Sequence, residues 1–81
     1  MNKAQAISLA QQYRMEGELD GSECADYVVV IRKGQVVGCN YQRRPAEGTP
    51  HGDINVDIND NVFIALGHSI SVWAKYWVPL A

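Results

Sequence analysis

The clearest structural signal in this sequence lies at residues 27–42, YVVVIRKGQVVGCNYQ. Two runs rich in β-branched residues lie on either side of Lys33-Gly34, and each run is too short for a globular helix. Lys33-Gly34 supplies a two-residue turn, so the stretch predicts a β-hairpin with strands at residues 27–32 and 35–42. The fold should therefore contain an antiparallel sheet.

The two cysteines bear on the cellular compartment. With the turn centred on residues 33–34, Val28 lies opposite Cys39, whereas Cys24 precedes the strand and falls opposite Arg43. Such a hairpin does not bring the two sulfur atoms together. Two cysteines are also too few for a disulfide framework, which agrees with a reducing compartment. The first residues lack the unbroken apolar stretch of an export signal, so we expect a cytoplasmic protein.

Length and charge exclude several classes. The chain has 81 residues, 47% of them hydrophobic and 20% charged, which suits one globular domain over residues 1–81 with one core. No apolar run approaches the ~20 residues that cross a bilayer, so no membrane association is expected. A net charge of −2 argues against nucleic-acid binding, because nucleic-acid binders usually carry a basic face.

A first helix is predicted over residues 3–16. Asn2 and Gln5 have the spacing of an N-cap and its capping-box partner, and apolar residues follow at the spacing of one helical face. Gly17 can adopt the left-handed conformation that ends a helix. The predicted helix therefore has one apolar face to pack on the sheet.

The second half of the chain adds more strand. Residues 53–59 alternate polar and apolar side chains, which predicts a strand with one solvent-facing side. Residues 62–78 fit both a helical stripe and an extended chain, but their β-branched residues and the Gly67-His68 turn favour two strands. We expect an α+β fold with the helix packed on a four-stranded antiparallel meander. The alternative is α-β-β-β-α with a C-terminal helix over residues 69–77.

One polar constellation could bind a ligand. His51, Asp53 and His68 should gather at one end of the sheet if the strands pair across residues 59–61. Two imidazoles and a carboxylate can serve a metal or an acid–base site, although strict alternation sends His68 to the opposite face. Residues 53–64 resemble a calcium loop but lack its glycine and its final glutamate, so no metal and no cofactor are expected.

The aromatic residues near the C-terminus give the strongest functional indication. On a strand, Trp73 and Trp77 flank Lys75 on one face, and the opposite face is apolar as well. One helix covers one face of a sheet, so the second face should be covered by another copy of the chain, a partner protein or a flat ligand. Loops of the same chain are the remaining alternative.

Together these patterns predict a non-enzymatic interaction module, expected to be a homodimer or to bind another protein. The predicted contact surface combines Trp73, Lys75 and Trp77 with the loop at residues 43–52, including Arg43 and Arg44. The second hypothesis is a small-molecule-binding protein or enzyme that uses the cleft near His51, Asp53 and His68. Base stacking of single-stranded nucleic acid on the two tryptophans ranks last, because Lys75 is the one basic residue beside them.

Overall fold

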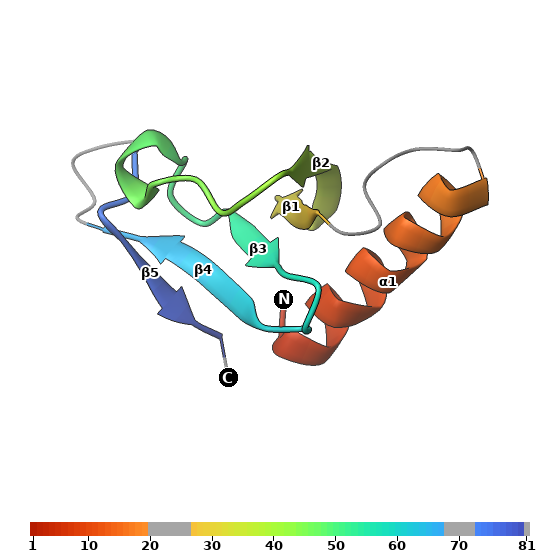
Figure 1. Cartoon of the computed structure of the whole chain (residues 1–81). Helices are drawn as coiled ribbons and strands as arrows, with labels where there is room; N and C mark the ends of the chain where they lie inside the picture. The colour runs from red at the N-terminus through yellow and green to blue at the C-terminus, as the bar shows by residue number, and fades with distance from the viewer. Residues whose placement is uncertain (20–26, 68–72, 81) are drawn as a thin grey trace.

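The computed structural model describes residues 1–19, 27–67 and 73–80, with the side chains of residues 18 and 19 left aside. Within those residues the chain forms one α-helix, one short 3-10 helix and a five-stranded antiparallel sheet (Figure 1). The elements in chain order are α1 (Lys3–Leu19), β1 (Val28–Arg32), β2 (Gln35–Asn40), η2 (Ala46–Gly48), β3 (Ile54–Val56), β4 (Val62–Leu66) and β5 (Tyr76–Pro79). The predicted α+β class is confirmed.

The predicted total of four strands is wrong, because the extended segments predicted at residues 27–32, 35–42, 53–59 and 62–78 already amount to five strands. The predicted meander order is wrong as well. The observed order is β2-β1-β3-β4-β5, with every neighbouring pair antiparallel. The five strands comprise the pair β1 and β2, the pair β4 and β5, and the single strand β3, which lies between β1 and β4. After β2 the chain crosses one face of the sheet and returns on the far side of β1, so β3 pairs with β1 instead of β2.

The first hairpin has the predicted turn but a shifted register. Lys33 and Gly34 both have positive φ, as a tight hairpin turn requires, and Arg32 pairs with Gln35. An irregularity between Val30 and Ile31 then moves the pairing by one residue, so Cys39 lies opposite Val29. The predicted pairing of Cys39 with Val28 is therefore wrong by one position.

Cys39 is disulfide-bonded. The prediction that the hairpin keeps the two sulfur atoms apart also involves the second cysteine of the sequence. That prediction assumed that regular strand pairing continues as far as residue 43. β2 ends at Asn40, so the regular pairing stops before that residue. The other cysteine of the sequence, Cys24, lies outside the described residues.

The C-terminal segment is extended where the structure describes it. Trp73 forms an isolated bridge with Pro50, and β5 pairs with β4 so that Trp77 lies opposite Ala65. The alternative C-terminal helix is thus wrong for residues 73–77, and the remaining positions of that alternative, residues 69–72, lie outside the described part.

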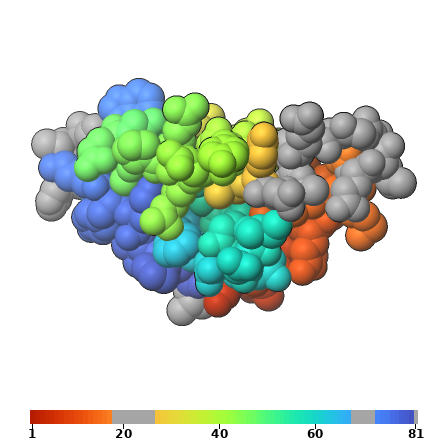
Figure 2. All heavy atoms as spheres, in the orientation of Figure 1, coloured from red at the N-terminus to blue at the C-terminus, as the bar shows by residue number. Residues whose placement is uncertain are grey.

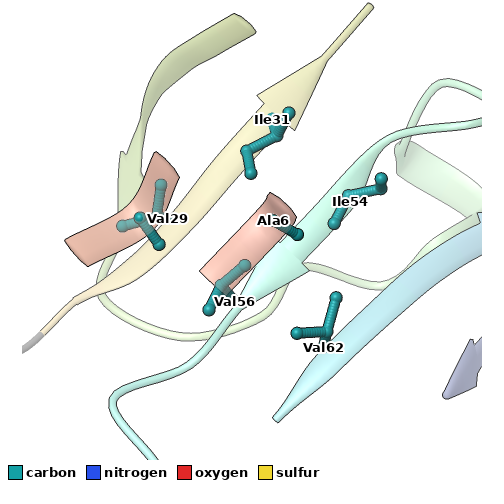
Figure 3. Packing of buried hydrophobic residues seen from close by; sticks show 7 residues of the cluster. Ala6, Val29, Ile31, Ile54, Val56 and Val62 are labelled. Carbon is teal, nitrogen blue, oxygen red and sulfur yellow. The ribbon is translucent and has the colours of Figure 1, made fainter. Parts of the chain in front are cut away.

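α1 begins at the predicted cap and covers one face of the sheet. The Asn2 backbone N–H donates to Gln5 Oε1 at 2.9 Å, and the Gln5 N–H donates to Asn2 Oδ1 at 2.8 Å, which is the reciprocal pattern of a capping box. The helix continues to Leu19, three residues beyond the predicted end, because Gly17 is accommodated within it. The buried core under the helix (Figure 3) contains Ala6, Ala10, Val29, Ile31, Ile54, Val56 and Val62.

The opposite face is covered in part by the chain itself. Residues 41–50 fold over it, and Ala46 of η2 packs in a second cluster with Ala65, Ala74 and Trp77. Figure 2 shows the green atoms of this segment lying beside the blue atoms of the C-terminal segment. The alternative in which loops of the same chain cover the second face is therefore observed over β4 and β5.

Candidate ligand-binding cavity

Asp53, directly before β3, and Asn55, within β3, are buried, which corrects the prediction of a solvent-facing side for these two positions of the predicted strand at residues 53–59. Asp53 and Asn55 are 2% and 3% exposed, and both lie on the sheet face away from α1. They are buried because residues 41–50 return over that face. The alternating pattern correctly separates the two sides of β3, but its polar side faces the covering segment instead of water.

Asp53 is fully engaged by Arg32. Arg32 donates from Nε to Asp53 Oδ1 at 2.9 Å and from Nη2 to Asp53 Oδ2 at 2.8 Å, which is a bidentate ion pair. The hydrogen bonds to Asp53, followed by its charge, raise the pKa of the Arg32 guanidinium above its ordinary value. The carboxylate thus holds β1 and β3 together.

Asn55 has an unsatisfied acceptor. Its Oδ1 atom is buried and has no hydrogen-bond partner within the described chain. Burying a carbonyl oxygen without a donor costs about 1–3 kcal/mol, so native structures contain few such atoms and each one calls for an explanation. Asn55 lies opposite Phe63 on β4, in the middle of the sheet.

A cavity of about 300 Å³ opens beside this amide. Its lining combines apolar side chains with a few polar groups. Among the described residues, the apolar and aromatic members are Val28, Tyr41, Ile58 and Phe63. The polar members are Gln42, Arg43, Asn55 and Asp57. Small-molecule sites commonly have this composition and begin at about this volume.

The rim of the cavity carries an ordered cation. The guanidinium carbon of Arg43 lies 4.1 Å from the centre of the Phe63 ring and 5.6 Å from that of Trp77. The Trp77 indole Nε1 donates to the backbone oxygen of Arg44 at 2.9 Å and so fixes the same stretch of chain. The guanidinium is held against two aromatic rings, which is a favourable cation–π geometry.

A smaller hollow of about 100 Å³ lies on the other side of Asn55. Its lining is more polar and includes Arg32, Asn40, Thr49 and Asp53. Thr49 is buried and donates from Oγ1 to the Pro45 backbone oxygen at 2.9 Å, so this part of the covering segment is well fixed. The hollow has room for solvent, whereas the larger cavity has the volume and apolar walls that an organic ligand needs.

Asp57 also lines the larger cavity. Its Oδ1 accepts from the backbone N–H groups of Asn59 and Asn61, and its Oδ2 accepts from Asn61 Nδ2, at 2.9–3.0 Å. The carboxylate therefore stabilises the turn after β3. In the described part of the chain, no group of three or more His, Cys, Asp and Glu side chains could hold a metal ion.

The predicted ligand-binding residues have different environments. His51 is exposed in a turn, Asp53 is buried and paired with Arg32, and His68 lies outside the described residues. Their joint site stays a prediction. Of the predicted contact residues, the fold brings Arg43, Arg44 and Trp77 together beside the cavity, while Trp73 and Lys75 are exposed.

Comparison with protein-family models, curated proteins and solved structures found no match to this chain. In the residues that the structure covers, no helix has both the length and the apolarity to span a membrane.

Sequence reasoning missed Asn55 and Phe63 as site residues. Their pairing depends on the register between β3 and β4, which the turn at residues 57–61 sets. The signal that could have identified Asn55 is its position between Ile54 and Val56, whose side chains lie on the helix side of the sheet. Because side chains alternate along a strand, that position assigns Asn55 to the opposite face. That face was taken as solvated because the path of residues 41–50 is not encoded locally.

Proposed function

We propose that this chain is a small-molecule-binding domain whose site is the cavity between residues 41–43 and strands β3 and β4. The observation that carries the proposal is the side chain of Asn55, which is 3% exposed, contains a buried Oδ1 without a hydrogen-bond partner, and lines a cavity with apolar walls. Because Oδ1 has almost no accessible surface, the Asn55 amide would turn toward the cavity, where a ligand N–H or O–H group would supply the missing hydrogen bond.

Two further features support a ligand in this position. The walls bring Val28 and Phe63 from the sheet together with Tyr41 and Ile58 from loops, so an apolar body could be enclosed from several sides. Arg43 and Asn55 then offer polar groups at separate points of the lining. A few polar contacts within an apolar site orient a ligand and give specificity.

A fragment screen by thermal shift tests this proposal. Bound ligand raises the melting temperature by mass action, and the effect grows with ligand concentration. We expect fragments that stabilise the wild type and fail to stabilise Asn55→Leu, which keeps the size of the side chain and removes its acceptor. Asn59→Leu changes an exposed asparagine outside the cavity lining and is the matched control. Equal stabilisation of wild type and Asn55→Leu by every hit would contradict the proposal.

A second function is favoured by one specific observation. Trp73 is 50% exposed, although its backbone is fixed by the bridge to Pro50. Exposed aromatic residues are enriched at protein interfaces. We therefore also propose that Trp73 and Lys75, with residues 43–52, contact a second copy of the chain.

Light scattering at micromolar concentration separates this function from ligand binding alone. We expect a dimer mass for the wild type and a monomer mass for Trp73→Ala, because the substitution removes the exposed indole. Val37→Ala, at an exposed apolar position on β2, the edge strand opposite β5, should leave the mass unchanged. A monomer mass for the wild type would overturn the dimer.

The cytoplasmic location inferred from the sequence remains a proposal, and the disulfide at Cys39 counts against it. Disulfides persist mainly in oxidising compartments. Thiol alkylation immediately after cell lysis, followed by mass measurement, decides the matter, because a cytoplasmic protein should be alkylated without added reductant.

A further inference from the structure

We propose that the ligand of this cavity is a small organic monocarboxylate that carries an N–H or O–H donor at the end away from the carboxylate. Arg43 would bind the carboxylate and Asn55 would accept the donor, with an apolar body between them. This inference rests on the proposed small-molecule function and specifies its ligand class.

Arg43 is suited to receive the carboxylate. Its guanidinium lies over the rings of Phe63 and Trp77, so the aromatic contacts use the flat face of the group. The N–H donors lie along the edge of a guanidinium and pair with the two oxygens of a carboxylate in a fork. Within the described residues the ion pair is between Arg32 and Asp53. Arg43 therefore forms no ion pair with a carboxylate in this part of the chain.

The other charges of the cavity favour a single negative charge on the ligand. Asp57 also borders the cavity, and it already accepts hydrogen bonds from Asn59 and Asn61. Its negative charge opposes a second ligand anion. A cavity lined by one arginine and one aspartate among apolar side chains thus fits a monocarboxylate better than a phosphate, which carries up to two charges and needs several donors.

Asn55 sets the other end of the ligand. Its buried Oδ1 is an acceptor, so the matching ligand atom must be a donor. A ligand that places an acceptor or a methyl group there would leave the same oxygen unpaired. Sites of this kind reject analogues that lack the required donor, because the buried protein group then stays unsatisfied.

Three matched probes test the two contacts separately. They are para-hydroxybenzoate, which has both groups, para-hydroxybenzamide, which lacks the negative charge, and para-methoxybenzoate, which lacks the donor. Calorimetric titration should show that para-hydroxybenzoate binds roughly 10- to 100-fold more tightly than either analogue, as expected for one charge-assisted or buried hydrogen bond.

Two variants assign each preference to its residue. In Arg43→Met the preference for carboxylate over carboxamide should disappear, while the preference for hydroxyl over methoxy remains. In Asn55→Leu the opposite pattern is expected. Arg43 is exposed at the rim, so its replacement should not prevent folding, and the thermal unfolding midpoint verifies this. If a variant fails to fold, the comparison of the three probes on the wild type still decides.

The outcomes separate this inference from the proposed function. Equal binding of para-hydroxybenzoate and para-hydroxybenzamide, with dependence on Asn55 retained, would overturn the carboxylate class and leave the small-molecule site intact. Absence of saturable binding of all three probes at millimolar concentration, together with an unproductive fragment screen, would overturn both.

Discussion

Asn55 on β3 lies directly opposite Phe63 on β4, and both side chains border the cavity on the sheet face away from α1. The pair places a buried, unpaired amide oxygen beside an aromatic ring whose face is covered by the Arg43 guanidinium. A polar residue at the centre of a sheet is costly unless it is hydrogen-bonded. This cost is the basis of the proposed function.

Asn55→Leu should raise the free energy of unfolding in the absence of ligand by about 1 kcal/mol, because it removes an unpaired buried acceptor and keeps the volume. Urea unfolding measures the change. Asn59→Leu, at an exposed position, should change it by about 0.5 kcal/mol or less. A loss of stability in Asn55→Leu would show that the amide is satisfied in the folded protein.

Arg32 and Asp53 should behave as a coupled pair in a double-mutant cycle. Arg32→Met leaves the buried Asp53 carboxylate without its bidentate partner, so the urea midpoint should fall. Asp53→Leu in the same chain should recover most of the loss, because the uncompensated charge is then gone. Additive effects of the two substitutions would contradict the pairing seen between β1 and β3.

Arg14 should be required to dock α1 on the sheet. Its Nη2 donates to the backbone oxygens of Tyr27 and Val56 at 3.0 and 2.9 Å. Arg14→Met leaves both oxygens without this donor, and we expect the free energy of unfolding to fall by about 1–3 kcal/mol. Lys3→Met, on an exposed part of the same helix, is the control and should have little effect. Similar values for the two variants would disprove the docking role.

The location of the core is tested by two identical substitutions. Val56 is fully buried beneath α1, whereas Val37 on β2 is 53% exposed. Val56→Ala should lower the free energy of unfolding by about 2–3 kcal/mol, from lost burial and the cavity left behind. Val37→Ala should lower it by about 0.5 kcal/mol or less. A reversed order of the two effects in urea unfolding would refute the packing of α1 against this face.

The elements that local patterns encode were predictable. The cap formed by Asn2 and Gln5 predicted the start of α1, and Lys33-Gly34 predicted the turn of the first hairpin. The position of β3 beside β1 was not predictable, because it depends on the long crossing segment at residues 41–53. Local periodicity carries no information on such a path.

The site shows the same division between local and distant information. Arg43 and Trp77 were singled out as contact residues, but their approach to each other across the sheet joins positions 34 apart in sequence. Asn55 was assigned to a solvated side because alternation distinguishes two sides of a strand without saying what covers each one. Asp53 was expected to be available, and its pairing with Arg32 spans 21 residues.

A crystal structure of the protein soaked with para-hydroxybenzoate will show whether the cavity binds a ligand through Asn55. We expect the probe in the cavity beside Phe63, with its hydroxyl about 2.5–3.0 Å from Asn55 Oδ1. A structure in which Asn55 Oδ1 accepts a hydrogen bond from the protein itself, with the probe absent from the cavity, would contradict this expectation.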